Sequence, residues 1–191
     1  MTPLKSRQLI GFHDGSPLAA DGALWRAIED NHRCNRLLWD EEDLARRRHA
    51  PDAEIAGNKR AIDRYNQQRN DAIERVDELL SNLFSERMNT RNSRLSSETP
   101  GAMIDRLSIL SLKIRSMRLQ TERTDVDRAH VDECMRKLNR LNEQRADLAG
   151  CLDRLLAECE RGESRFKIYR QFKMYNDPNL NPAVYGEKRQ G

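Results

Sequence analysis

Hydrophobic residues recur along most of the chain at spacings of three and four, which is the period of an amphipathic α-helix. Start and stop signals divide this pattern into four stretches, at about residues 17–48, 52–87, 99–122 and 124–161. No stretch of any length alternates between apolar and polar residues as a half-buried strand does. The pattern therefore predicts an all-α protein, and long helices with short links favour an antiparallel four-helix bundle over residues 17–162.

The ends of the predicted helices carry capping residues. Ser16 before the first helix and Thr99 before the third are each followed by proline, which suits the first position of a helix. The segment TDVD, from residue 124, is a capping box that places Asp127 at the third position of the fourth helix. Gly162 follows the basic last turn of that helix and fits a C-terminal glycine cap.

Charged and amide residues interrupt the inward-facing stripes of all four helices. The second helix is continuously hydrophobic toward Leu83, and the third is apolar nearly all round, which predicts that it is the most buried. The interrupting residues are Asn35 and Glu42 in the first helix, Lys59, Asn66 and Arg69 in the second, Asp105 and Lys113 in the third, and Arg145 in the fourth.

These interruptions predict a polar pocket inside one part of the bundle. A buried charge costs several kcal/mol unless it is paired, so such positions are rarely charged without a reason. Antiparallel packing brings Glu42 beside Lys59 and Asn66, and Arg69 and Arg145 join them if the fourth helix crosses there. Two other interpretations stay open. The long side chains can extend to solvent at the bundle ends, or they can form ion pairs that only set helix register.

The segment 163–182 ends the helical pattern with aromatic, basic and proline residues. Phe166, Tyr169 and Phe172 share one face of a short amphipathic helix that could dock on the bundle, and the prolines of NDPNLNP then end it. We hypothesise a lid, whose polar residues face a ligand; the alternative is a tail that only covers an apolar groove. The lid residues that would face the ligand are Arg170, Lys173, Asn176 and Asp177.

Four segments carry a resemblance to a known family: LLWDEEDLARR, IDRYNQQRNDAIE, SSETPGAMIDRLSILSLKI and YRQFKMYNDPNLNP. Over residues 25–182 the chain resembles the bacterial family called domain of unknown function 4254. The resemblance implies a helical bacterial protein connected with the synthesis of lipopolysaccharide or other surface glycans, with no established activity. Arg115 departs from it, since an aromatic residue is implied there. The positions to which the resemblance points are Trp39, Glu42, Asp43, Arg46, Asn66, Arg69, Asn70, Glu98, Pro100, Gly101, Asp105, Arg106, Lys113, Tyr169, Arg170, Lys173, Asn176 and Asp177.

The Thr-Pro-Gly start of the third helix is a candidate anion site. Backbone N–H groups are unpaired at a helix start, and Gly101 would let a phosphate or carboxylate approach them. Glu98 and Asp105 could instead hold a cation or act as a base. Capping alone would also explain Thr99 and Pro100.

Composition narrows the class of protein. A chain of 191 residues is expected to form one domain, and 37% hydrophobic with 34% charged residues is typical of long helices with solvated outer faces. A net charge of +3 gives no strong attraction to nucleic acid or to anionic lipid. No stretch has the apolar length of a signal peptide or of a transmembrane helix.

The cysteines and histidines do not have the spacing of a metal site. The four cysteines show no C-x-x-C pair and fall within helical patterns, as buried free thiols of a reducing cytoplasm would. The four histidines are scattered, so no metal is expected. No phosphate-binding loop, dinucleotide fingerprint or catalytic triad supports a specific reaction, and the sequence leaves the cofactor unknown.

Two functions from different classes follow. The first is an enzyme of surface-glycan synthesis that acts on a phosphorylated sugar or sugar nucleotide, with Glu42 or Asp105 as acid or base. The second is a non-catalytic helical adaptor that binds a glycosyltransferase or a similar protein through its tail. The predicted ligand-binding residues are Asn35, Lys59, Asn66, Arg69, Asn70, Arg106, Lys113, Arg145, Tyr169, Arg170, Lys173, Asn176 and Asp177.

Overall fold

The computed structural model describes residues 4–17, 21–88, 93–170, 177 and 179–187. Its elements are α1 (Ser6–His13), α2 (Ala23–Ala45), α3 (Asp52–Met88), β1 (Arg94–Leu95), α4 (Pro100–Thr121), α5 (Arg128–Glu160), β2 (Ser164–Arg165) and α6 (Pro182–Glu187). The described residues are mainly helical, and the strands among them form one two-stranded sheet. The prediction of a mainly α-helical protein is therefore confirmed. Within the described part of the chain, no helix is long and apolar enough to cross a membrane.

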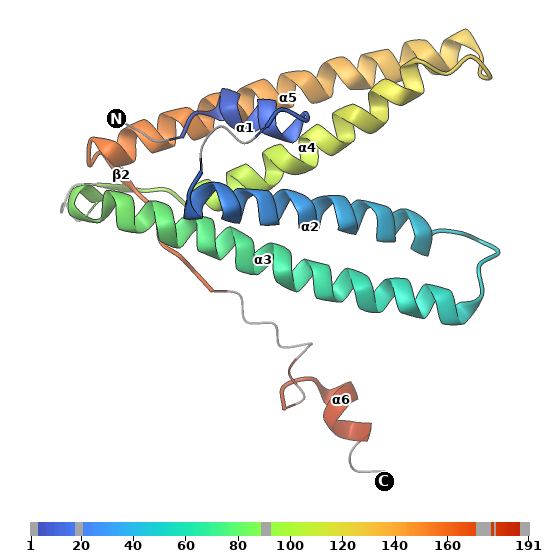
Figure 1. Cartoon of the computed structure of the whole chain (residues 1–191), viewed down its shortest axis with the longest axis horizontal. Helices are drawn as coiled ribbons and strands as arrows, with labels where there is room; N and C mark the ends of the chain where they lie inside the picture. The colour runs from blue at the N-terminus through green and yellow to red at the C-terminus, as the bar shows by residue number, and fades with distance from the viewer. Residues whose placement is uncertain (1–3, 18–20, 89–92, 171–176, 178, 188–191) are drawn as a thin grey trace.

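The four long helices form two hairpins, α2–α3 and α4–α5. Figure 1 shows the hairpins close together where α3 and α5 end, and far apart at their connecting loops. Each hairpin is antiparallel as predicted, but packing of all four helices along their whole length into one bundle is not confirmed. The polar ends of the hairpins are exposed, so each hairpin tip is stabilised mainly by its own two helices.

The core lies where the two hairpins meet. Leu80 and Phe84 of α3, Leu107 of α4, and Leu152 and Leu156 of α5 are each 1% exposed or less. The helix α4 contacts α1, α2, α3 and α5, which explains why its sequence is apolar on nearly every face.

The N-terminal part departs from the predicted boundaries. The first long helix begins at Ala23, after Gly22 at φ 137°, and not at residue 17. Residues Ser6–His13 form the separate helix α1, which the hydrophobic pattern did not predict. Its Leu9 is fully buried, and Ser6 donates from its backbone N–H and hydroxyl to Asp153 at 2.9 and 2.7 Å. An eight-residue helix is too short to show a clear period, so only its packing on α4 and α5 reveals it.

The other helix ends follow the capping chemistry more closely. Thr99 caps α4, accepting from the Ala102 N–H at 3.2 Å, as predicted. Asp127 also acts as a cap, accepting from the His130 N–H at 2.8 Å, so α5 begins at residue 128 and not at 124. The helix α5 ends before Gly162, which takes a φ of 74° and confirms the predicted glycine cap.

The segment after α5 is extended and not helical. Its strand β2 pairs in parallel with β1, through Ser96 N–H donating to the Arg165 carbonyl at 2.8 Å. The prediction of an amphipathic helix is therefore wrong for residues 163–170, because the carbonyls of Glu163 and Arg165 pair with β1 and residues 166–170 continue without helical structure. Phe166 is 5% exposed and belongs to the core. Phe172, which the predicted helix also included, lies outside the described residues.

Candidate functional site

A buried carboxylate joins α2 to α4. Oδ1 of Asp105 accepts hydrogen bonds from Nδ2 of Asn31 at 2.8 Å and from Nδ2 of Asn35 at 2.9 Å. All three residues are less than 9% exposed. On α3, Nε of Arg69 lies 3.9 Å from the same oxygen and has no hydrogen-bond partner among the described residues. Two amides and a nearby guanidinium offset the desolvation of the carboxylate, which would otherwise cost several kcal/mol.

The network continues along α4 to a histidine. The Oγ of Ser108 accepts from Nδ2 of Asn35 at 3.0 Å and lies 2.8 Å from Nδ1 of His32. Ser108 is fully buried. We call the connected set of Asn31, His32, Asn35, Asp105 and Ser108 the buried polar network.

A cleft of about 430 Å³ opens beside this network, between α2, α3 and α4. Its lining residues are Asn35, Leu38, Trp39, Glu42, Asp43, Arg46, Asn66, Arg69, Ile109 and Leu112. Four predicted site residues, Asn35, Glu42, Asn66 and Arg69, are therefore brought together from two helices. Asp105 lies behind Asn35 and Arg69 and does not line the cleft.

The lining of the cleft is only partly engaged by the protein itself. Glu42 pairs with Arg46 one turn along α2, at 3.0 Å. No other described side chain forms a hydrogen bond or ion pair with Asp43 or Asn66. The carboxylate of Asp43, the amide of Asn66, which can donate and accept, and the ring of Trp39 are therefore available to a ligand.

Other predicted members of this pocket lie elsewhere. Lys59 is exposed and pairs with Asp63 on its own helix. Arg106 and Lys113 face α5, where they line a different cavity with Asp147. The prediction of a single pocket that holds all of these cations is therefore wrong. Lys59 and Lys113 are both exposed, because the long side chain of a lysine at stripe spacing can extend to solvent.

Arg145 is also placed away from the cleft. Its Nη1 lies 2.8 Å from both carboxylate oxygens of Asp14, the residue that follows α1. Its side chain is 14% exposed and that of Asp14 is 42% exposed, so the pair is partly buried, on the side of the arginine. The unpredicted helix α1 covers this part of α5, which is why the stripe of α5 tolerates an arginine here.

The start of α4 is closed by the protein's own carboxylate. Oδ1 of Asp77 accepts from the Gly101 N–H at 2.6 Å, and its side chain is also hydrogen-bonded to Thr99. A Cβ at Gly101 would lie 2.6 Å from the Ile73 carbonyl oxygen. The glycine thus allows α3 and α4 to approach each other. The prediction that an external anion approaches this helix start is wrong, because the Asp77 carboxylate already occupies the Gly101 N–H.

Burial governs the ionisation of Asp77. Desolvation raises its pKa to about 6, although the hydrogen bonds from Thr99 and Gly101 act in the opposite direction. Asn70, a predicted ligand residue, is 8% exposed and lines the cavity beside Asp77, not the α2–α3–α4 cleft.

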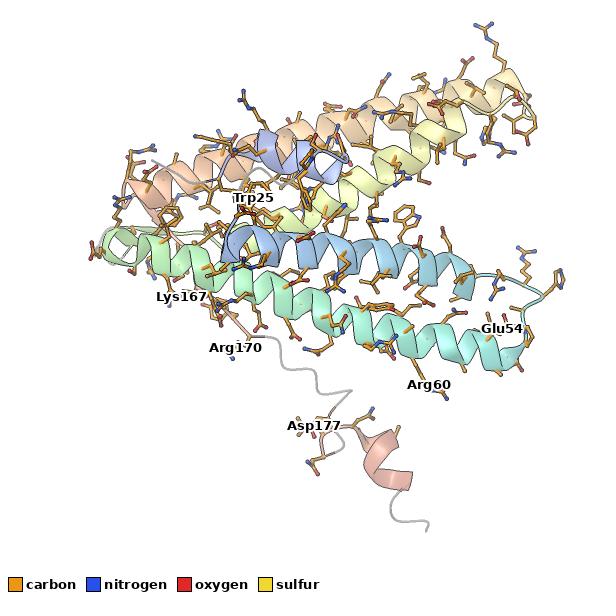
Figure 2. All side chains as sticks on the ribbon, viewed as in Figure 1. Trp25, Glu54, Arg60, Lys167, Arg170 and Asp177 are labelled. Carbon is orange, nitrogen blue, oxygen red and sulfur yellow. The ribbon has the colours of Figure 1, made fainter. Side chains whose placement is uncertain are left out.

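Residues 167–170 of the tail lie beside α3. Arg170 pairs with Glu78 at 3.0 Å, and the Tyr169 side chain is 73% exposed beside the cavity at Asp77. Figure 2 shows Lys167 and Arg170 on the outer side of α3. The prediction that Arg170 lies beside the charges of the cleft is therefore wrong, because Arg170 pairs with Glu78 instead. Lys173 and Asn176 lie outside the described residues, and Asp177 accepts from the Asn179 N–H at 2.8 Å.

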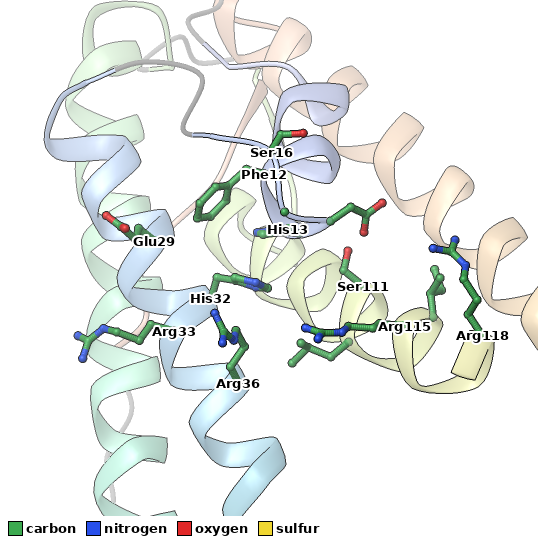
Figure 3. Close-up of a pocket in the computed structure, with 14 residues that line it drawn as sticks. Phe12, His13, Ser16, Glu29, His32, Arg33, Arg36, Ser111, Arg115 and Arg118 are labelled. Carbon is green, nitrogen blue, oxygen red and sulfur yellow. The ribbon is translucent and has the colours of Figure 1, made fainter. Parts of the chain in front are cut away.

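Sequence reasoning missed a second cavity, of about 550 Å³, between α1, α2 and α4. Figure 3 shows His13, His32 and Ser111 at its centre, with Arg36 and Arg115 below them. The inward position of His32 on α2 was the one available signal. His13 comes from α1, which was not predicted, so the histidine pair could not be recognised.

The cysteines are free, and Cys34, Cys134 and Cys159 are buried. Burial raises the pKa of the Cys159 thiol to about 11, so this thiol stays protonated at neutral pH. Cys151 is exposed, which corrects the expectation that all four thiols are buried. Among the described residues no group of three or more metal-ligating side chains occurs.

Comparison with known proteins places the chain in a family. The model of the family described as "Protein of unknown function (DUF4254)" matches residues 25–168, and the chain belongs to this family. The match contains the cleft and the buried polar network but begins after α1. Neither the curated proteins nor the solved structures gave a match.

Proposed function

We propose that this member of the DUF4254 family binds a phosphorylated sugar or a sugar nucleotide in the α2–α3–α4 cleft. The observation that carries the proposal is the meeting of Trp39, Asn66 and Arg69 with the carboxylates of Glu42 and Asp43 around one cleft. Its volume of about 430 Å³ lies within the range of small-molecule sites, about 300–1,000 Å³.

The lining suits the hydroxyl groups of a sugar. Hydroxyls donate to carboxylates such as Asp43 and accept from amides and guanidinium groups such as those of Asn66 and Arg69. An aromatic ring such as that of Trp39 offers a flat apolar face to the C–H side of a sugar ring. Arg69 also provides positive charge for a phosphoryl group. Its Nε lies 3.9 Å from Asp105, and that carboxylate takes its hydrogen bonds from Asn31 and Asn35, so the N–H groups of Arg69 are not used by Asp105.

The chemistry proposed for the cleft is binding. Asp105 accepts two buried hydrogen bonds and does not line the cleft, so its role is to hold Asn35 and Arg69 in place. Glu42 lines the cleft and remains the candidate acid or base for any reaction there. We further propose that the ligand belongs to bacterial surface-glycan synthesis in the cytoplasm, as the family resemblance implies.

The adaptor alternative has less support. A docking surface for a partner protein would gather apolar residues on one face. The large apolar side chains that are exposed in the described part of the chain are spread over α2, α3, β1, α4, α5 and the C-terminal segment, where they are Tyr169 and Leu180. No particular observation therefore favours this second function.

A thermal-shift screen of hexose phosphates and nucleoside diphosphate sugars tests the proposal. A ligand that binds only the folded protein raises the melting temperature, and the rise grows with the logarithm of the ratio of ligand concentration to Kd. Arg69→Gln is expected to weaken that ligand about tenfold or more, and Asn66→Ala about threefold to tenfold. The matched control is Arg60→Gln, which removes the same charge from the outer side of α3 (Figure 2).

Two outcomes would reject the proposal. One is that no member of the panel raises the melting temperature of the wild-type protein. The other is that Arg60→Gln weakens binding as much as Arg69→Gln does, because the ligand would then respond to overall charge and not to the cleft.

A further inference from the structure

The cavity between α1, α2 and α4 has three properties of a prepared binding site: unpaired arginines, a buried imidazole without a partner, and a histidine oriented by the buried polar network. Its charged lining residues are Asp14, Glu29, Arg33, Arg36, Arg115 and Arg118.

The arginines give the cavity a surplus of positive charge. Arg33 pairs with Asp30 at 2.8 Å, and Asp14 pairs with Arg145, so these charges are already balanced. No carboxylate among the described residues pairs with Arg36 or Arg115. Figure 3 shows both arginines below His32, with the guanidinium end of Arg115 extending toward α2 and that of Arg36 next to His32, while Arg33 points away.

Two like charges that line one cavity from different helices repel each other, and an anion bound between them offsets that repulsion. Arg36 comes from α2 and Arg115 from α4, and both are exposed enough for a ligand to reach them. A pair of guanidinium groups presents parallel N–H donors, the arrangement that suits the oxygens of a phosphoryl group.

The imidazole of His13 has no hydrogen-bond partner. Its side chain is 7% exposed, and both ring nitrogens are buried without a partner among the described residues, as is the Oγ of Ser111. The rings of His13 and His32 are stacked with centroids 4.8 Å apart. Leaving such groups unpaired costs about 1–3 kcal/mol each, so the wall of the cavity contains buried polar atoms whose hydrogen-bonding capacity is not used within the described part of the protein.

The second histidine is oriented by its hydrogen bond. Nδ1 of His32 lies 2.8 Å from the Ser108 hydroxyl, which already accepts from Asn35 and can donate to this nitrogen. In that arrangement Nε2 carries the proton and acts as a donor toward the cavity. Burial, and then the charge of Arg36, lower the pKa of His32 to about 4, so the ring is neutral at neutral pH.

We propose that this cavity is a binding site for a phosphoryl group, held by the guanidinium groups of Arg36 and Arg115 and by Nε2–H of His32. Part of the site comes from α1, which lies before residue 25, where the family match begins. The proposal does not rest on the ligand of the α2–α3–α4 cleft, since the two cavities share only Leu112 in their linings.

Calorimetric titration with inorganic phosphate at neutral pH tests the site. Arg36→Gln and Arg115→Gln are each expected to weaken phosphate binding about tenfold or more, since each removes a charge-assisted hydrogen bond. Arg33→Gln is the matched control: it removes the same charge from the rim of the same cavity, and its affinity is expected to stay within about twofold of wild type. All three arginines are exposed, and circular dichroism checks that the variants are folded.

The contribution of His32 has its own readout. Phosphate is expected to shift the imidazole nitrogen resonances of His32 in the wild-type protein, and this shift should be lost in Arg115→Gln at the same phosphate concentration. Asn66→Ala, in the other cleft, should leave both the affinity and the shift unchanged, so a failure of the sugar site and a failure of this site give different results.

Several outcomes would overturn the proposal. Wild-type protein could show no binding at phosphate concentrations up to about 10 mM, which would mean a binding free energy weaker than roughly −3 kcal/mol. Arg36→Gln and Arg115→Gln could bind as wild type does, or Arg33→Gln could lose as much affinity as they do. The resonances of His32 could also stay unchanged when phosphate binds.

Discussion

Gly101 brings the backbone of α4 against α3. Its N–H donates to Asp77, and a Cβ at this position would meet the Ile73 carbonyl oxygen at 2.6 Å and the Asp77 carboxyl at 2.8 Å. Backbone atoms cannot move aside as the end of a flexible side chain can. The requirement for glycine is therefore steric and arises from the packing of two helices.

Gly101→Ala is expected to lower the free energy of unfolding by about 1–3 kcal/mol, the cost of forcing extra volume into a packed contact. Urea denaturation measures the change. Gly57→Ala and Gly150→Ala are the controls, since these glycines lie inside α3 and α5 with nothing within 4 Å of the added Cβ. Both controls should gain about 0.5–1 kcal/mol from helix propensity, and a similar gain at Gly101 would contradict the steric explanation.

Asp77 makes stability depend on pH. Its folded-state pKa of about 6 lies above the usual 3.8, so the folded protein holds this proton more tightly than the unfolded chain. The group stabilises the fold below pH 3.8 relative to its ionised form, and this contribution is lost as the pH rises through about 6.

Asp77→Asn should remove this dependence. The amide oxygen still accepts from Gly101, but the group no longer has to ionise in a buried place. At pH 8 the variant is expected to be more stable than wild type by about 1–3 kcal/mol, and the difference should fall toward zero near pH 4. Thermal or urea unfolding at both pH values measures it. A loss of stability in the variant at pH 8 would show that the charge itself stabilises the start of α4.

At the scale of elements, the short strand β2 decides what the C-terminal segment does. Its pairing with β1 directs the chain out of α5 in an extended conformation, which places Phe166 in the core and leaves Tyr169 exposed. Phe166 and Tyr169 would share one face of a helix, but in this extended segment Phe166 is buried and Tyr169 is exposed.

Phe166→Ala is expected to cost about 3–5 kcal/mol of unfolding free energy, as other large-to-small core substitutions do. Tyr169→Ala should change it by less than about 0.5 kcal/mol, because that side chain is mostly in solvent. Denaturation of the two variants gives the comparison. Equal effects would mean that the segment packs through a helical face after all.

At the scale of the whole molecule, the protein has one well-packed end and two separate hairpin tips (Figure 1). The core residues gather where α3 and α5 end, whereas residues 52–60 at the start of α3 are mostly exposed. Local stability is expected to follow this gradient.

Native-state hydrogen exchange measures that gradient. Amides around Leu80, Leu107 and Leu152 should exchange only through global unfolding, while those of residues 52–60 should exchange through local opening at a lower free energy. Uniform protection along α3 would indicate instead that the hairpins unfold as one unit with no separate tips.

The sequence by itself determined the helical class, the extent of α3 and the ends of α4, because periodic burial and local capping are encoded within a few residues of each other. It also indicated that Asn35, Glu42, Asn66 and Arg69 would share one place. This inference combined helix phase with the antiparallel pairing of α2 and α3.

Only the tertiary structure decided which polar positions are enclosed. Lys59 and Arg145 follow the same spacing, yet one faces solvent and the other pairs with Asp14 beneath α1. The histidine cavity likewise requires α1, whose eight residues are held by packing on α4 and α5. Helix phase determines which side chains share a face, but burial depends on which element covers that face, and this is set by contacts between residues far apart in the sequence.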